Sequence, residues 1–96
     1  MSKILQDINI GKNIQKLRKA RGLTQKDVCA QLTILGRPML QSTYAQIETG
    51  ARNIFVSDLI VLKEVLKVSY DDFFRNLKPI NKYDVGLPSK PEAEPP

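Results

Sequence analysis

Apolar residues recur every three or four positions through most of this 96-residue chain. Ile10, Ile14 and Leu17 follow this spacing while lysines occupy the other faces, and the pattern predicts an amphipathic helix over about residues 11–19. Gly22 comes soon after it, and glycine tolerates the left-handed conformation that commonly ends a helix. No stretch of the first 78 residues shows the two-residue alternation of a strand, so the pattern predicts an all-α fold.

The second predicted helix begins with a recognisable cap. Thr24 stands at the N-cap position and Asp27 follows three residues later, which is an acidic variant of the capping box, so the helix is predicted to start at Gln25. Its expected apolar face consists of Val28, Cys29, Leu32 and Leu35. Pro38 disfavours helix in the residue before it, and a long connection is therefore predicted over about residues 34–40.

A third helix is predicted from Gln41 to Thr49, with Gly50 as its C-terminal cap. Its inner face is expected to contain Tyr44, Ala45 and Ile47. Its outer face is expected to contain Gln41, Ser42 and Gln46. A capped helix, a connection and then a glutamine-rich helix that ends in glycine is typical of a helix-turn-helix DNA-binding segment.

Two further helical patterns follow. Ser57-Asp58 is predicted to open a fourth helix. The apolar face of this helix is expected to contain Leu59, Leu62, Val65 and Leu66. Ser69 is predicted to cap a fifth helix over about residues 70–76, because the acids that follow it favour the positive end of a helix dipole. This short helix should bury Phe73 or Phe74.

The composition changes beyond Lys78. Five of the last 18 residues are proline and the apolar periodicity stops, so residues 79–96 are expected to form a flexible, disordered tail or linker. Residues 1–78 are expected to form one domain, because a chain of this size can bury a modest core without disulfides or metal.

The distribution of charge along the chain indicates what kind of partner it could bind. The net charge is +5, and residues 1–78 hold 13 Lys/Arg against 7 Asp/Glu, a net +6, whereas residues 79–96 hold 2 against 3, a net −1. A basic folded part suits an anionic partner such as nucleic acid. A surface charge that merely keeps the protein soluble explains the excess equally well.

Several classes of protein are disfavoured by composition. The chain has no histidine and only one cysteine, Cys29, which excludes an intrachain disulfide and a Cys/His metal cluster, so we expect neither metal nor cofactor. Cys29 is expected to be a buried thiol, since a redox sensor would need exposure and a lowered pKa. No apolar run could span a membrane and no signal peptide is visible, so a cytoplasmic protein is expected.

Three segments in this order resemble the Cro/C1-type (XRE) helix-turn-helix family of phage and bacterial repressors: Leu17-Arg18-Lys19-Ala20-Arg21-Gly22-Leu23-Thr24-Gln25, Ile47-Glu48-Thr49-Gly50 and Leu59-Ile60-Val61-Leu62. The resemblance covers about residues 10–76. It implies a compact five-helix, lambda-repressor-like DNA-binding domain, encoded by a bacterium or phage, whose third helix enters the major groove. The chain departs from the family in its long connection over residues 33–39, and in Leu40, where the family usually has a serine or threonine cap.

Arg18 and Glu48 are expected to have a structural role. Arg18 lies beside the apolar stripe of the first predicted helix, and Glu48 lies on the inner side of the third. A half-buried charge needs a partner, because an unpaired buried ion costs several kcal/mol. The family resemblance implies that these two positions form an ion pair, and the alternative is that each is a solvated surface charge.

Gln41, Ser42 and Gln46 are the candidate base contacts. A glutamine amide can form a two-point hydrogen bond with adenine, and a serine hydroxyl can donate or accept at several bases. By residue type alone, all three are ordinary solvated helix residues. Their place in the motif is what favours contact with bases.

Candidate phosphate contacts lie mainly at two helix ends. The start of the second predicted helix offers backbone N–H groups at a positive helix end, and the loop after the third offers further donors. The candidates are Thr24, Gln25, Lys26, Arg37, Thr49, Arg52 and Asn53. For each of them the alternative is a solvated surface residue.

Together these features predict a sequence-specific, DNA-binding transcriptional regulator, most often a repressor that occupies a near-palindromic site on double-stranded DNA as a homodimer. Dimerisation is expected through the last two helices, with Tyr70, Phe73 and Phe74 as candidates unless they complete the monomer core. The alternatives are an antitoxin that binds a toxin, a regulator with another protein partner such as an anti-repressor, and an interaction module that does not bind DNA. An enzyme is least expected, because Asp71 and Asp72 are adjacent and not paired across a cleft.

Overall fold

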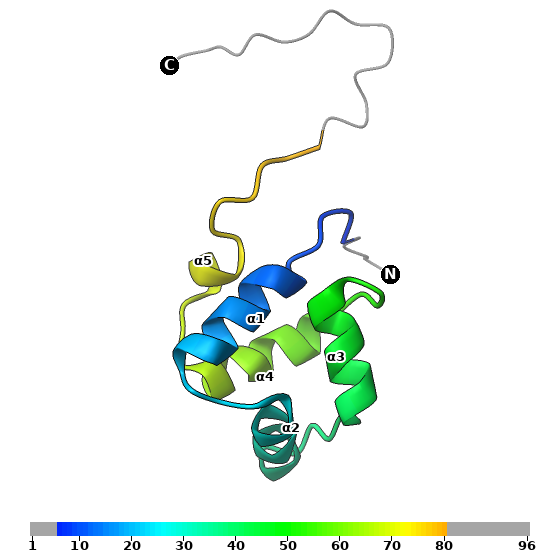
Figure 1. The fold of residues 1–96 in the computed structure, drawn as a ribbon, viewed down its shortest axis with the longest axis vertical. Coiled ribbons are helices and arrows are strands. Elements are labelled where there is room, and N and C mark those ends of the chain that lie inside the picture. Colours follow the sequence, from blue (N-terminus) through cyan, green and yellow to red (C-terminus); the bar gives the residue numbers. More distant parts are fainter. Residues whose placement is uncertain (1–5, 81–96) are drawn as a thin grey trace, which may run out of the picture.

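The computed structural model describes residues 6–80, which contain five helices and no strand (Figure 1). The helices are α1 (Gly11–Ala20), α2 (Gln25–Ile34), α3 (Gln41–Thr49), α4 (Val56–Leu66) and α5 (Tyr70–Phe73). The predicted all-α, five-helix fold is therefore confirmed. No helix in the part of the chain that the structure describes is long and apolar enough to cross a membrane.

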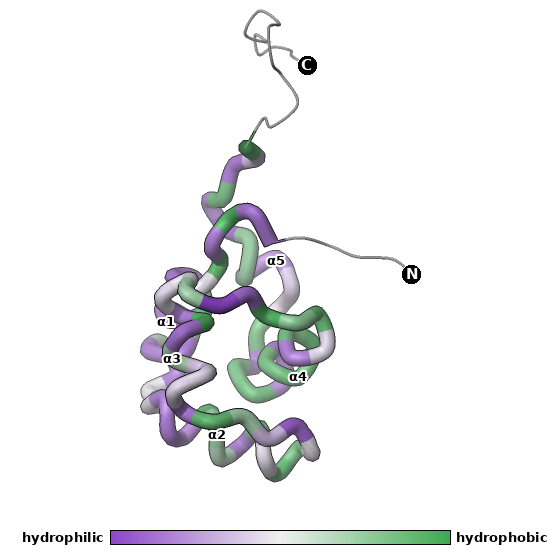
Figure 2. Tube along the Cα trace, turned by 90° about the vertical axis from the view of Figure 1, so that its right-hand side faces the viewer, coloured by the Kyte–Doolittle hydropathy of each residue, from purple (hydrophilic) through white to green (hydrophobic). Residues whose placement is uncertain are grey.

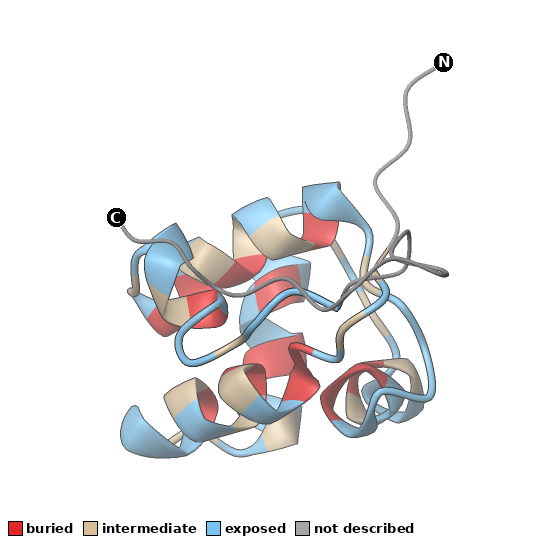
Figure 3. Cartoon of the chain, turned by 90° about the horizontal axis from the view of Figure 1, so that it is seen from above, coloured by how far each residue is buried: buried red, intermediate tan, exposed pale blue. Residues whose placement is uncertain are grey.

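The helices pack around one core. Helix α1 contacts α3 and α5, while α2 contacts α3 and α4. Buried residues lie on the inner sides of the helices and exposed residues face outward (Figure 3). The core consists of Ile10, Ile14, Val28, Cys29, Leu32, Tyr44, Ile47, Leu62, Val65, Leu66 and Phe73. Apolar residues occur along most of α4, whereas α1 and α3 are mainly hydrophilic (Figure 2), and α4 contributes Leu62, Val65 and Leu66 to the core.

Two capping boxes set helix starts where the sequence predicts them. The Thr24 hydroxyl accepts the Asp27 backbone N–H at 3.0 Å, and the Asp27 carboxylate accepts the Thr24 N–H at 2.9 Å. The hydrogen bond from the Thr24 backbone lowers the pKa of Asp27. At α5 the Asp72 carboxylate accepts the Ser69 N–H at 3.0 Å. Each box satisfies backbone donors that the first turn of a helix leaves unpaired.

Helix α4 begins differently from the prediction. Its N-cap is the extended residue Phe55, so Ser57 lies within the first turn and does not cap it. The Leu59 backbone N–H donates to the Phe55 carbonyl at 3.1 Å, so the first helical hydrogen bond already begins at Phe55. Asp58 is buried within this turn and pairs with Arg37.

Two other expectations were wrong in detail. Leu35 is the C-cap of α2 and is 52% exposed, because α2 ends before Leu35 could join its apolar face. Helix α5 ends at Phe73 and not near Asn76, because the chain continues in turns with Asn76 at a φ of +64°. Phe73 is fully buried, whereas Phe74 is 52% exposed.

The predicted division into a domain over residues 1–78 and a tail over 79–96 stays a prediction. Pro79 and Ile80 belong to no helix, and Ile80 is exposed. Residues 1–5 and 81–96 lie outside the described residues.

Candidate nucleic-acid interface

The outer side of α3 is polar and carries no acidic group. Gln41, Ser42 and Gln46, the three candidate base contacts, are all exposed there. Helical spacing turns Tyr44, Ile47 and Glu48 to the opposite side, where they are buried. Because Glu48 is the only acid in α3, the exposed side of this helix offers amide and hydroxyl groups without a carboxylate that would repel phosphate.

Arg18 and Glu48 hold α1 and α3 together. The Arg18 Nε donates to Glu48 Oε2 at 2.6 Å and its Nη2 donates to Oε1 at 3.0 Å, which makes the pair bidentate. The two residues are only 8% and 3% exposed. The Arg18 Nη1 also donates to the Leu23 carbonyl at 2.9 Å, so one guanidinium joins α1, the turn after it and α3.

Gln25 extends this network. Its Nε2 donates to Glu48 Oε1 at 3.0 Å, so the side chain lies against the buried ion pair. Burial alone would raise the pKa of Glu48, but the hydrogen bonds from Arg18 and Gln25 hold that pKa below its ordinary value. The hydrogen bond to Glu48 likewise raises the pKa of Arg18. Both groups are therefore charged at neutral pH.

The first residue of α1 and the segment before it also hold the end of α3. Gly11 lies so close to α3 that a Cβ at this position would overlap the backbone carbonyls of Ile47 and Glu48. The Asn9 side chain accepts the Gly11 N–H at 2.7 Å and donates to the Thr49 carbonyl at 3.5 Å. Sequence reasoning missed these contacts, although an Asn-x-Gly segment just before a predicted helix is a local signal for such a turn.

At the start of α2, two of the three candidate phosphate contacts already have side-chain partners. The Thr24 oxygen caps the helix, which leaves the hydroxyl proton free to donate. The Gln25 side chain bonds to Glu48, so its free group at this helix end is the backbone N–H. Lys26 is exposed. This helix end thus presents one flexible cation together with first-turn N–H groups.

In the loop after α3, a candidate phosphate contact touches a candidate base contact. The Arg52 Nε donates to Gln46 Oε1 at 3.1 Å, and the Arg52 backbone N–H donates to the Gln46 carbonyl at 3.2 Å. The Thr49 hydroxyl also donates to the Gln46 carbonyl, at 3.1 Å. Asn53 is exposed. The structure therefore brings Gln46, Thr49 and Arg52 into one hydrogen-bonded group at the end of α3.

Arg37 lies apart from both groups. Its Nε donates to Asp58 Oδ1 at 2.5 Å, which ties the connection between α2 and α3 to the first turn of α4. The side chain of Arg37 is 40% exposed and that of Asp58 is 10% exposed. Sequence reasoning did not find this partner, because 21 positions separate the two residues.

The described residues offer little for metal or redox chemistry. No group of three or more acidic, cysteine or histidine ligands gathers within residues 6–80. Cys29 is a buried free thiol. Burial raises its pKa, which keeps the thiol protonated and unreactive at neutral pH.

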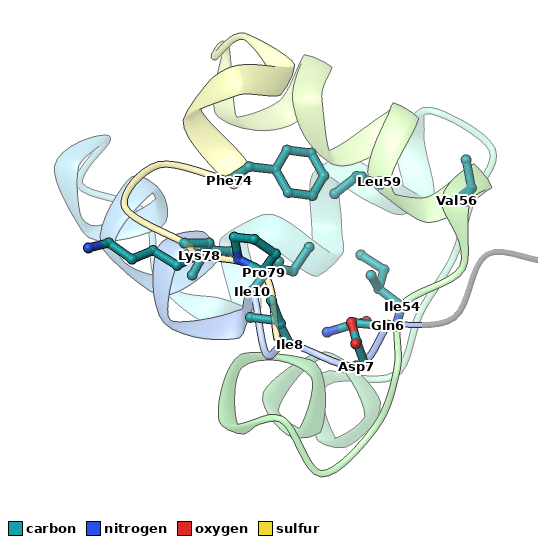
Figure 4. A pocket seen from close by; sticks show the side chains of 11 residues that line it. Gln6, Asp7, Ile8, Ile10, Ile54, Val56, Leu59, Phe74, Lys78 and Pro79 are labelled. Atoms are coloured by element: carbon teal, nitrogen blue, oxygen red, sulfur yellow. The ribbon is translucent and has the colours of Figure 1, made fainter. Parts of the chain in front are cut away.

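A separate apolar groove of about 420 Å³ lies between the segment before α1, the start of α4 and the end of α5 (Figure 4). The Gln6 side chain forms one edge and accepts the Ile54 N–H at 3.0 Å. The apolar lining includes Ile8, Ile10, Ile54, Val56, Leu59 and Phe74. None of the candidate DNA contacts lines this groove.

Comparison with known families gives one match. A family model described as helix-turn-helix matches residues 14–73, which is more than half of the chain. The matched segment runs from the middle of α1 to the end of α5 and contains the whole of α2 and α3. No curated protein and no solved structure gave a significant match.

Proposed function

Because this chain belongs to the XRE-type helix-turn-helix family of DNA-binding transcription regulators, we propose that it is a Cro/C1-type repressor that binds operator DNA with α3 in the major groove. The observation that carries this proposal is the distribution of polar groups on α3. Gln41, Ser42 and Gln46 are exposed, while the only carboxylate of the helix is buried and paired with Arg18. We propose that these three residues contact bases.

Phosphate contacts are proposed on both sides of α3. Thr24, Gln25 and Lys26 would hold one stretch of backbone through side-chain donors and the N–H groups at the positive end of α2. The second group would be Thr49, Arg52 and Asn53 in the last turn of α3 and the loop after it. These contacts would set the register of α3 in the groove, and the bases would supply the specificity.

A dimer is proposed on the side of the molecule away from α3. Phe73 belongs to the core, so it cannot form an interface, but Tyr70 and Phe74 are 43% and 52% exposed. Phe74 also lines the apolar groove beside α4. A second copy of the chain covering this region would remove apolar area from water and present two α3 helices about one turn of DNA apart. Such a regulator would work in the cytoplasm, where bacterial and phage DNA is found.

Selection of bound sequences from a random pool of double-stranded DNA tests this proposal. We expect a near-palindromic consensus, bound with an affinity that falls steeply as salt rises. Arg52→Ala should flatten the log–log salt dependence by about one unit. Exposed Lys67, which follows α4, supplies the matched control: Lys67→Ala removes the same charge and should leave the slope nearly unchanged.

The outcomes separate the candidate functions. A consensus without dyad symmetry would argue against the dimer, and an unchanged slope for Arg52→Ala would argue against that phosphate contact. If no sequence is enriched at moderate salt, the repressor proposal is wrong, and a protein-interaction role on the same fold would replace it.

A further inference from the structure

The connection between α2 and α3 has little apolar packing to hold it. Leu35 and Leu40, at its two ends, are 52% and 73% exposed. Met39 is half-buried and packs against the core. Leu40 is also the N-cap of α3 and makes no side-chain cap hydrogen bond. Contacts other than apolar packing or a side-chain cap must therefore fix the position of the start of α3, which carries Gln41 and Ser42.

Arg37 lies in the middle of this connection and is bonded to two helices. Its backbone N–H donates to the Leu32 carbonyl at 2.8 Å, which closes the C-terminal end of α2 around Gly36 at a φ of +83°. Its side chain donates to the largely buried Asp58 carboxylate in α4 at 2.5 Å. The residue is thus held from both sides at once.

We infer that Arg37 and Asp58 form a positioning pair that sets how α3 presents its first turn to DNA. The inference rests on the proposed function. Only residues 38–40 separate Arg37 from the start of α3, and the ring of Pro38 restricts the backbone φ among them. A displacement of the Arg37 backbone should therefore also displace Gln41.

The alternative is that Arg37 contacts phosphate directly. Its guanidinium already has a carboxylate partner, and Asp58 is only 7% exposed. A phosphate that captured Arg37 would leave that buried carboxylate unpaired, which is unfavourable. The ion-pair geometry therefore favours positioning over phosphate binding.

Asp58→Asn distinguishes the two roles, because they predict effects of opposite sign. Glu64→Gln is the matched control: it removes the same charge from the same helix, but the Glu64 side chain is 70% exposed and lies 3.8 Å from its partner Lys63. If Arg37 positions α3, Asp58→Asn should reduce the ratio of specific to non-specific DNA affinity by about fivefold or more relative to the control, the cost of about one lost base contact. If Arg37 binds phosphate, freeing it should keep or raise affinity for all DNA sequences, and the inference would be overturned.

Arg37→Gln provides a second and independent measurement. Positioning predicts a lower specificity ratio with an unchanged salt slope, whereas loss of a phosphate contact predicts a slope lower by about one unit and a uniform loss of affinity. Circular dichroism should first verify that both variants fold. Should Asp58→Asn not fold, Arg37→Gln carries the same test, because its side chain is more exposed.

Hydrogen exchange on the free protein tests the pair without DNA. Either variant should speed exchange of the Tyr44 amide, which bonds to the Leu40 carbonyl at 3.0 Å in the first turn of α3, and leave the last turn unchanged. Unchanged exchange at Tyr44 would overturn the inference. A wild-type protein that binds no preferred sequence would instead refute the proposed function, and the exchange result would still decide the role of the pair.

Discussion

The last turn of α3 contains the buried residues Ile47 and Glu48 and is bonded to its surroundings, whereas the first turn begins with exposed residues and follows an uncapped, exposed leucine. At the end of the helix, Glu48 pairs with Arg18, and Gly11 lies against the carbonyls of Ile47 and Glu48. At the start, Gln41 and Ser42 are exposed and Leu40 makes no cap hydrogen bond.

This contrast separates the part of the nine-residue helix that stabilises the fold from the part proposed to recognise DNA. The residues that join α3 to the fold are Tyr44, Ile47 and Glu48, and they are buried. The proposed base contacts Gln41, Ser42 and Gln46 lie on the other side and are exposed. Substitutions in the two groups should therefore affect different measurements.

Glu48→Ala should have the largest effect. It leaves the Arg18 guanidinium buried without its partner, so the free energy of unfolding should fall by about 3–5 kcal/mol. Urea denaturation measures this as a lower midpoint at an unchanged m-value. Glu64→Ala, at an exposed position, should cost less than about 0.5 kcal/mol. Equal losses of stability in the two variants would mean that Glu48 contributes no more than an exposed carboxylate, and the last turn of α3 would not be the anchored end of the helix.

The pH dependence of stability should sharpen the same contrast. The folded pKa of Glu48 is held below its ordinary value of 4.5, so its contribution to stability is fully present above about pH 4.5 and is lost as the pH falls through the folded pKa. The advantage of the wild type over Glu48→Gln should therefore shrink below pH 4.5. Asp27 and Asp72 are present in both proteins, so their titrations cancel in this difference. A constant advantage down to pH 2 would contradict the role given to the Glu48 charge.

Gly11→Ala should have the next largest effect on stability. In an ordinary helix this change gains about 0.5–1 kcal/mol, but here the new Cβ would meet the Ile47 and Glu48 carbonyls and force α1 away from α3. We expect a net loss of about 1–3 kcal/mol, measured by denaturation. Lys12→Ala, at the exposed neighbouring position, is the control and should stay within about 0.5 kcal/mol. A stabilised Gly11→Ala variant would mean that the close approach is not needed.

Gln41→Ala should separate recognition from stability. We expect a loss of about 1–3 kcal/mol in DNA binding and a relaxed preference at one base pair, because one set of base hydrogen bonds is removed. The free energy of unfolding should change by less than about 0.5 kcal/mol, since the residue is exposed. Binding to a panel of single-base operator variants measures both the loss and its position. An equal loss on every sequence would reassign Gln41 to the DNA backbone.

Tyr44→Phe should have the smallest effect. Among the described residues, the Tyr44 hydroxyl is the only buried side-chain polar atom without a hydrogen-bond partner. Removing it leaves the ring in place and takes away a hydroxyl without a hydrogen-bond partner, so stability should change by less than about 1 kcal/mol. Thermal denaturation monitored by circular dichroism checks this. A clear loss would show that the hydroxyl contributes to the Glu48 network.

Local signals made most of the fold predictable. The Thr24 and Ser69 caps placed two helix starts, and apolar periodicity identified most of the core. The start of α4 was misplaced because its N-cap, Phe55, has no side-chain acceptor to reveal it. The end of α5 was misplaced because the chain turns after Phe73, with Asn76 at a φ of +64°, and no glycine or proline in the sequence marks that turn.

The partners of the candidate site residues were harder to predict. Family resemblance brought Arg18 and Glu48 together, although 30 positions separate them. Nothing in the sequence pointed from Arg37 to Asp58, from Gln25 to Glu48 or from Asn9 to Thr49. These contacts depend on how the helices pack against one another. Local sequence patterns do not reveal that packing, least of all across the long connection between α2 and α3.

The contact between Arg52 and Gln46 restricts what Gln46 can recognise. Arg52 uses one of the two acceptor lone pairs of the Gln46 side-chain carbonyl, whereas the Gln46 NH₂ group makes no hydrogen bond within the described residues and is free to donate. Adenine offers a donor and an acceptor side by side, whereas guanine offers two acceptors in the major groove. If Gln46 contacts a base as proposed, the contact with Arg52 fixes the orientation of its amide and leaves it fewer ways to accept than to donate. We therefore expect Arg52 to influence the preferred operator even without touching a base.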